Sequence, residues 1–202
     1  QAETFLLQAL RGAGPAGLAA MPRQRRRQNI RWVRPWLEQP RKAIEAYLQR
    51  HRLGFVDDPS NADSRHARNR LRRELWPALA HSFEHAETSL LASALRAQEA
   101  AACLRELAQI DACPDGGLQV SSWLGLSAAR RANLLRVWLS GPASAGVPES
   151  LVQRLLRELP EAASASAWPW PGGELRLHAG QLQVLRGTEK RAAPDPLPID
   201  LS

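Results

Sequence analysis

The segment FVDDPSNADSRHARNRLRRELWPAL, residues 55–79, joins an acidic turn to a strongly basic helix. Ser, Asn and Asp side chains in the turn supply the oxygens that are typical of a helix start. The predicted helix contains five arginines within nine residues. Because side chains three, four or seven positions apart share one face of a helix, four polar residues are predicted to line up. They are Arg65, Arg68, Asn69 and Arg72.

An apolar stripe is predicted beside this polar face, and it should pack against a core. It consists of Ala67, Leu71, Leu75 and Ala78. The arginines would then border the buried side of the helix, where guanidinium groups are suited to bidentate contacts with phosphate or carboxylate. Asn69 is a poor residue for a helix interior, and a polar partner explains it better than helix propensity. A solvated basic face with local acidic partners is the alternative.

Composition favours a polyanionic partner. The 202 residues contain 27 Lys and Arg against 20 Asp and Glu, which gives a formal charge of +7 and a pI near 10.8. Cys103 and Cys113 lack zinc-like spacing, so we expect free thiols in a reducing, cytoplasmic compartment. No run of eighteen apolar residues occurs, and we therefore expect no membrane span.

Hydrophobic periodicity predicts the other elements. Helices are expected at residues 1–10, 40–53, 80–110, 126–139 and 148–159. Strands are expected at residues 29–37, 118–123, 174–178 and 181–185, the last two joined tightly at Ala179-Gly180. The basic run at residues 22–28 is expected to be a solvated loop.

A change in composition after residue 79 indicates two domains. Residues 1–79 are predicted to be the C-terminal part of an α/β domain, residues 80–190 a helical domain that ends in a β-hairpin, and residues 191–202 a linker. The fold class is therefore mixed and mainly α. We expect the chain to be a fragment, and exposed apolar surface within residues 1–55, where one strand would lack neighbours.

Several motifs resemble one family in their order and spacing. The opening QAET, the strand RWVRPWL, the helix PRKAIEAYL and the block DDPSNAD…ARNRLRREL occur in this order in tRNA(Ile)-lysidine synthetases. The helix LSAARRANLLRVWL and the hairpin LRLHAGQLQVLRG are similar to that family's substrate-binding domain. The resemblance extends over residues 1 to about 190, and the DPSN…RNxLR block is its most specific part.

The resemblance implies an enzyme of the N-type ATP pyrophosphatase group. Residues 1–79 would be the C-terminal remnant of its Rossmann-like ATP pyrophosphatase domain, and residues 80–190 its helical tRNA-binding domain. Such enzymes use ATP to adenylate the wobble cytidine of tRNA(Ile) with the CAU anticodon, and lysine then displaces AMP to form lysidine. The implied cofactors and partners are ATP, Mg²⁺, lysine and tRNA(Ile); a homodimer is left open.

Glu3 and Arg11 are the first site residues that the resemblance implies. Glu3 would be catalytic and help to hold Mg²⁺ near the phosphates, the alternative being an exposed carboxylate at a helix start. Arg11 would meet the nucleotide or the cytidine.

A second group of site residues would face the tRNA. The target cytidine and nearby backbone would be reached by Arg68, Asn69 and Arg72, with Arg65 on the same face. The preceding turn would orient these arginines through Asp58, Asn61 and Asp63. For Arg130, Arg131 and Arg136 in the later helix, both a tRNA contact and a solvated face stay open.

The family's ATP loop, S-G-G-x-D-S, and its His-x-x-Asp-Asp pair do not occur in the 202 residues. We therefore expect these residues to hold the tRNA-facing half of the site and to form no lysidine alone. The main alternative is a non-catalytic RNA-binding or structural module of the same fold. A tRNA thiolation enzyme of the same group is a weaker alternative, because Cys103 and Cys113 lack the usual pairing of catalytic cysteines.

Overall fold

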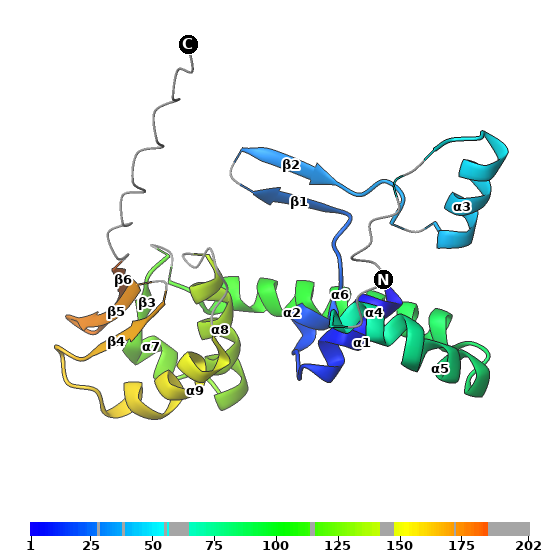
Figure 1. The fold of residues 1–202 in the computed structure, drawn as a ribbon. Coiled ribbons are helices and arrows are strands. Elements are labelled where there is room, and N and C mark those ends of the chain that lie inside the picture. The colour runs from blue at the N-terminus through cyan, green and yellow to red at the C-terminus, as the bar shows by residue number, and fades with distance from the viewer. Residues whose placement is uncertain are drawn as a thin grey trace, which may run out of the picture. The chain divides into compact units, whose positions relative to one another are not determined.

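Helices dominate the computed structural model of this protein (Figure 1). It describes residues 1–27, 29–37, 39–54, 56, 65–113, 116–141, 148–171 and 173–185. The chain forms two compact units, which we call unit 1 (Gln1–Cys103) and unit 2 (Leu104–Ser202). The expected fold class, mixed and mainly α, is confirmed at this level.

Unit 1 consists of short helices and one β-hairpin. In chain order its elements are α1 (Ala2–Leu10), α2 (Pro15–Leu18), β1 (Gln24–Arg27), β2 (Ile30–Val33), α3 (Arg41–Arg50), α4 (Ala67–Arg70), the π-helical turn η2 (Leu71–Leu75), α5 (Trp76–Ser82) and most of α6 (Ala86–Asp111). The helices expected at residues 1–10 and 40–53 are confirmed, although α3 is shorter than the expected range.

The basic run expected to be a loop is partly a strand. Residues of β1 pair antiparallel with β2, from Gln24 opposite Val33 to Arg27 opposite Ile30. The expected strand at residues 29–37 is thus shorter, and it has a neighbour. The reason is that an isolated strand would leave its backbone N–H and C=O groups without partners, and the adjacent basic run supplies them.

The basic helix begins later than its sequence suggests. Its first residue is Ala67, preceded by His66 in an extended conformation, so Arg65 lies before the helix. Within it, η2 adds one residue to a turn, because a π-helix bonds residue i to i+5. The extra residue rotates the following side chains, and Leu75 of the expected apolar stripe is 53% exposed while Leu71 is buried.

The long helical region is interrupted near its start. Phe83 has an extended backbone, φ −135° and ψ 96°, which separates α5 from α6. From there α6 is continuous through Asp111, and Ala94, Ala101 and Ala108 are buried along it at intervals of seven residues.

Unit 2 combines helices with a small antiparallel sheet of order β3-β6-β5-β4. After the end of α6, its elements are β3 (Leu118–Gln119), α7 (Val120–Leu124), α8 (Ala128–Ser140), α9 (Glu149–Glu158), the 3₁₀ turn η3 (Leu159–Glu161), β4 (Ala167–Trp170), β5 (Gly173–His178) and β6 (Gln181–Leu185). The strand expected at residues 118–123 is wrong beyond Gln119, where the chain turns helical, and β4 was not expected.

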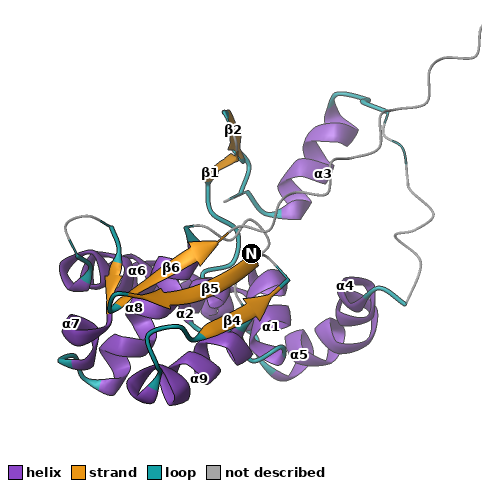
Figure 2. Ribbon diagram, turned by 90° about the vertical axis from the view of Figure 1, so that its left-hand side faces the viewer, coloured by secondary structure: helices purple, strands orange, loops and turns teal. Residues whose placement is uncertain are grey.

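One hydrophobic core holds unit 2 together. Helices α8 and α9 pack against one face of the sheet through Leu135, Leu155 and Leu175, each fully buried (Figure 2). The hairpin of β5 and β6 is confirmed, and the two residues at its turn, Ala179 and Gly180, have φ values of 47° and 77°. Positive φ at both positions matches the twist of the flanking strands, as in type I′ turns.

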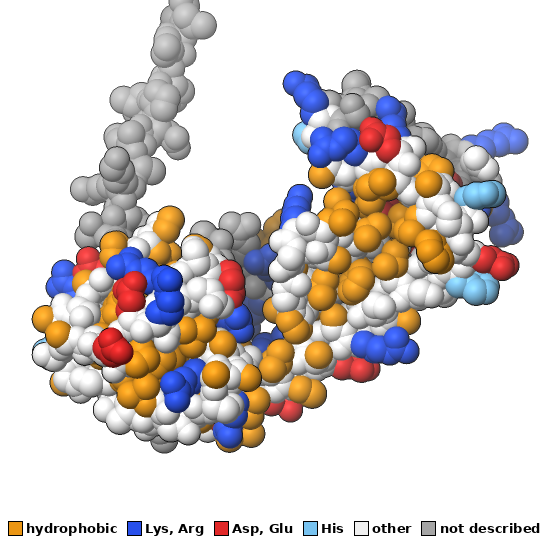
Figure 3. Space-filling model, turned by 90° about the horizontal axis from the view of Figure 1, so that it is seen from below, with side chains coloured by type: hydrophobic (Ala, Val, Ile, Leu, Met, Phe, Trp, Pro, Cys, Tyr) orange, Lys and Arg blue, Asp and Glu red, His pale blue; other side chains and the backbone are white. Residues whose placement is uncertain are grey.

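Hydrophobic side chains also gather on an open face of unit 1 (Figure 3). Large exposed hydrophobic residues of this unit are Leu10, Ile30, Trp32, Val33, Trp36, Tyr47, Leu53, Val56, Leu75, Phe83 and Leu95. The expectation of exposed apolar surface within residues 1–55 is therefore confirmed.

Candidate functional site

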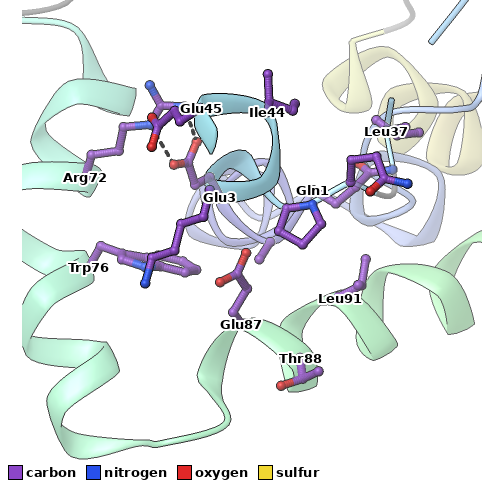
Figure 4. A pocket seen from close by; sticks show the side chains of 14 residues that line it. Gln1, Glu3, Leu37, Ile44, Glu45, Arg72, Trp76, Glu87, Thr88 and Leu91 are labelled. Carbon is purple, nitrogen blue, oxygen red and sulfur yellow. Dashed lines mark hydrogen bonds and ion pairs between the residues drawn. The ribbon is translucent and has the colours of Figure 1, made fainter. Parts of the chain in front are cut away.

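A bidentate ion pair joins α1 to the basic helix. Arg72 in η2 donates from Nε to Oε1 of Glu3 at 2.6 Å and from Nη2 to Oε2 at 2.8 Å (Figure 4). Both carboxylate oxygens are thereby engaged. The two side chains are 37% and 26% exposed, so the pair lies at the edge of the packed region and not in bulk water. This geometry is the strongest form of an Arg–carboxylate contact.

The neighbouring residue of α1 holds a second arginine. Arg68, one turn before Arg72, donates from Nη2 to Oγ1 of Thr4 at 2.9 Å, and its Nε lies 3.9 Å from Oε2 of Glu3. Two adjacent residues, Glu3 and Thr4, therefore fix two guanidinium groups on the same face of the helix. Such groups keep donors for a further ligand, since each guanidinium has five N–H groups.

Buried residues on the same helix support this arrangement. Leu71, 1% exposed, lies between the two arginines in sequence, and Asn69 is buried with 8% exposure. The first turn of α1 is fixed in turn by Gln1, whose side-chain amide donates to the Met21 carbonyl and accepts from the Met21 N–H. The helix that carries Glu3 and the helix that carries Arg72 are therefore both held in place without a ligand.

A pocket of about 740 Å³ opens beside the pair, within unit 1 (Figure 4). Charged and aromatic residues that line it include Glu3, Lys42, Glu45, Arg72, Trp76 and Glu87. The volume lies in the range of small-molecule sites, and the indole of Trp76 adds a flat apolar surface beside the charged side chains. Such a pocket suits a ligand that carries both a planar ring and charged or polar groups.

The structure brings together only some of the residues that the sequence proposes. Arg11, exposed, follows the last turn of α1, eight residues from Glu3 and thus roughly 12 Å along the helix axis at about 1.5 Å per residue. Arg65 is exposed, and its carbonyl accepts a hydrogen bond from the Arg70 guanidinium. Asp58, Asn61 and Asp63 lie outside the described residues.

The described residues do not by themselves fit a metal ion. Among them, no group of three His, Cys, Asp or Glu side chains could hold one. The carboxylate of Glu3 is engaged by Arg72 on both oxygens, which leaves it poorly placed as a ligand. We therefore derive no chemical step through Mg²⁺.

Two residues of the site escaped the sequence analysis. Thr4 carried no signal beyond its place in the QAET motif, and it is found only through its contact with Arg68. The sequence places Trp76 only at the end of the helix. In the structure Trp76 directly follows η2 and lines the pocket.

The arginines of α8 have partners inside unit 2. Arg130 pairs with the buried carboxylate of Asp111, which raises the pKa of Arg130 through their hydrogen bonds. Arg136 pairs with Glu149, and its hydrogen bonds lower the pKa of that carboxyl group. Each pair joins α8 to another helix of the same unit.

Arg131 completes this set. It donates from Nε and Nη2 to the carbonyl oxygens of Leu126 and Leu124, both at 2.8 Å, and its guanidinium lies over the buried ring of Trp123. Each of the three arginines thus has partners within unit 2, and both alternatives, a tRNA contact and a solvated face, stay open.

Two protein-family models match this chain. The model of the PP-loop domain matches residues 1–79, and the model of the TilS substrate binding domain matches residues 118–183. The first segment contains the Glu3–Arg72 pair, and the second contains most of the unit 2 core. No helix among the described residues is both long and apolar enough to span a membrane.

Relatives named tRNA(Ile)-lysidine synthase are similar to this chain. The relative from Ralstonia nicotianae is 41% identical over 207 residues, which cover 100% of this chain and 44% of the relative. The relatives from Alkalilimnicola ehrlichii and Pseudomonas aeruginosa are also 41% identical, over 92% and 96% of this chain and 43% and 47% of their own length. The chain thus spans a little under half the length of these relatives.

The ion pair predicts a measurable coupling between α1 and η2. In a double-mutant cycle of Glu3→Gln and Arg72→Met, the double variant should lose less unfolding free energy than the sum of the two single variants. The difference, the coupling energy, should be about 1 kcal/mol. The value is modest because both side chains are partly exposed. Urea denaturation of the full chain measures it, and Glu3→Gln with Arg73→Met is the control cycle. Additive losses in the Glu3–Arg72 cycle would contradict the geometry.

Proposed function

We propose that this chain is part of an enzyme that modifies tRNA(Ile), joining lysine to the wobble cytidine of the CAU anticodon to give lysidine. The observation that carries the proposal is the 41% identity to a tRNA(Ile)-lysidine synthase over the whole of this chain. The match of residues 118–183 to the TilS substrate binding domain supports it independently. Because the chain spans under half of that relative, the activity is proposed for the longer protein in which such residues work.

The paired arginines are proposed to face the tRNA. Arg68 and Arg72 are held from behind by Thr4 and Glu3, so that their remaining N–H groups can bind a phosphate or the cytidine edge. Prior fixation lowers the side-chain entropy that binding would otherwise cost. Asn69, which is buried, is proposed to support this face, and the pocket beside Arg72 is proposed to take the base.

Other residues are proposed to extend the same surface. Arg11 and Arg65 are exposed and add positive charge along the path of the tRNA backbone. The turn residues Asp58, Asn61 and Asp63 are proposed to orient the arginines. Glu3 acts in this proposal as a positioning carboxylate for Arg72.

ATP and lysine are proposed as the other substrates. ATP use is supported by the match of residues 1–79 to the PP-loop domain. When bound, ATP would supply the adenylyl group that activates the cytidine for attack by lysine. The S-G-G-x-D-S loop does not occur in these 202 residues, so the residues described above contribute binding and orientation.

The arginine face predicts a difference between two pairs of substitutions on one helix. Arg68→Ala with Arg72→Ala should weaken binding of tRNA(Ile) to the full chain and lower the salt slope of the affinity by roughly 1 for each of the two arginines that contacts a phosphate. Arg70→Ala with Arg73→Ala removes the same charge from residues outside the contact set and should change both quantities less. Filter binding at several salt concentrations measures them. Equal effects of the two pairs would contradict the proposal.

A non-catalytic RNA-binding module is the competing function, and the formal charge of +7 would serve it equally well. Nucleoside analysis separates the two. The native gene product that contains this chain should form lysidine in tRNA(Ile) with ATP and lysine, and Arg72→Ala should lower the yield. Tight tRNA binding without any lysidine from that gene product would establish the competing function instead.

A further inference from the structure

Side chains from α6 and from the residue before α1 hold a short backbone segment between α2 and β1. Gln98 on α6 donates from Nε2 to the Ala19 carbonyl at 2.8 Å. The side-chain amide of Gln1 donates to the Met21 carbonyl at 2.8 Å and accepts from the Met21 N–H at 3.0 Å. These three hydrogen bonds form a clamp on the backbone at both sides of Ala20, and both glutamines are distant from it in sequence.

Ala20, at the centre of the clamp, has an unusual backbone conformation. Its φ is 55°, in the left-handed region, although it is not a glycine. It directly follows Ala19, the C-cap of α2, where helices commonly continue into glycine because a Cβ opposes this conformation. Such backbone persists where the surrounding contacts determine it, and it is concentrated at functional sites. The hydrogen bonds of Gln98 and Gln1 supply those contacts.

The position of Gln98 on α6 connects the clamp with the site. Leu91, Ala94, Gln98 and Ala101 follow intervals of three and four residues, so they share one face of the helix. Ala94 and Ala101 are buried, and Leu91 lines the pocket of the site (Figure 4). A polar side chain on such a face is costly unless it is hydrogen-bonded. The bond to Ala19 therefore accounts for a glutamine at this position.

We propose that Gln98 is a positioning residue for Arg72. Its hydrogen bond fixes the Ala19–Met21 segment on α6, and this segment fixes Gln1 at the start of α1. Two residues further on, Glu3 holds Arg72 through both carboxylate oxygens. The value of this positioning rests on the proposed function, in which Arg72 faces the tRNA, but the clamp itself can be measured without RNA.

The first test observes the ion pair in the full chain without RNA. Gln98→Met removes the donor to Ala19 but keeps the length and the charge of the side chain. The Arg72 Nε–H, which donates to Glu3, should then shift in the NMR spectrum and exchange with water several-fold faster. Gln109→Met, at an exposed position of the same helix, is the matched control and should leave this signal unchanged. An Arg72 signal that is the same in Gln98→Met and in the unaltered chain overturns the proposal.

A second substitution separates positioning from a simple loss of packing around α6. Ala20→Gly permits the left-handed backbone without the clamp, so it should restore most of the Arg72 signal in the Gln98→Met chain. Ala16→Gly, at an exposed position of α2, is the control and should restore nothing. No restoration by Ala20→Gly, or equal restoration by both glycine substitutions, overturns the proposal.

The link to function has its own readout. Gln98→Met should weaken binding of tRNA(Ile) to the full chain roughly fivefold, the effect of about one hydrogen bond. It should cause no further loss when Arg72→Ala is already present, because it acts through that residue. Equal losses in both backgrounds, or no loss in the first, overturn the positioning role. An altered NMR signal in a chain whose tRNA affinity does not depend on Arg72 would uphold the clamp and contradict only the proposed function.

Discussion

The bidentate pair between Glu3 and Arg72 is the contact on which the arrangement of the site depends. It joins the first turn of α1 to a helix 69 positions further along the chain, and Thr4 extends the same contact to Arg68. A partly exposed ion pair of this kind contributes little to global stability, about 1 kcal/mol at most. Its main effect is orientation: two flexible side chains are held in one geometry before a ligand arrives, so that binding has less entropy to overcome.

Arginines in the two units illustrate why positive charge alone is a poor guide to nucleic-acid contacts. Arg130, Arg131 and Arg136 also form a basic cluster on one helix, and they pair with carboxylates, carbonyl oxygens and an indole within unit 2. Arg25, Arg26 and Arg31 have no such described partners. Arg72 itself pairs with a carboxylate, so partners within the chain do not by themselves decide which arginines contact nucleic acid.

Prediction from sequence succeeded where the determining forces are local. The helices of α1, α3, α8 and α9 follow from apolar spacing, and the β5–β6 hairpin follows from alternation around a two-residue turn. The arginine face was found from the interval between Arg68 and Arg72, but their partners were not, because Glu3 and Thr4 are distant in sequence. The strand β1 was missed since its arginines show no alternation of polarity, and η2 was missed because a single added residue leaves no periodic pattern.

The central claim is that the face built by Glu3 and Arg72 meets the target cytidine. It is tested most directly by the affinity of the full chain for two tRNA(Ile) transcripts that differ only at the wobble position, one with cytidine and one with uridine. The protein should prefer cytidine, roughly tenfold for one base contact, and Arg72→Ala should abolish the preference while Arg73→Ala preserves it. Equal affinities for the two transcripts in the unaltered protein, or a preference that survives Arg72→Ala, would contradict the account.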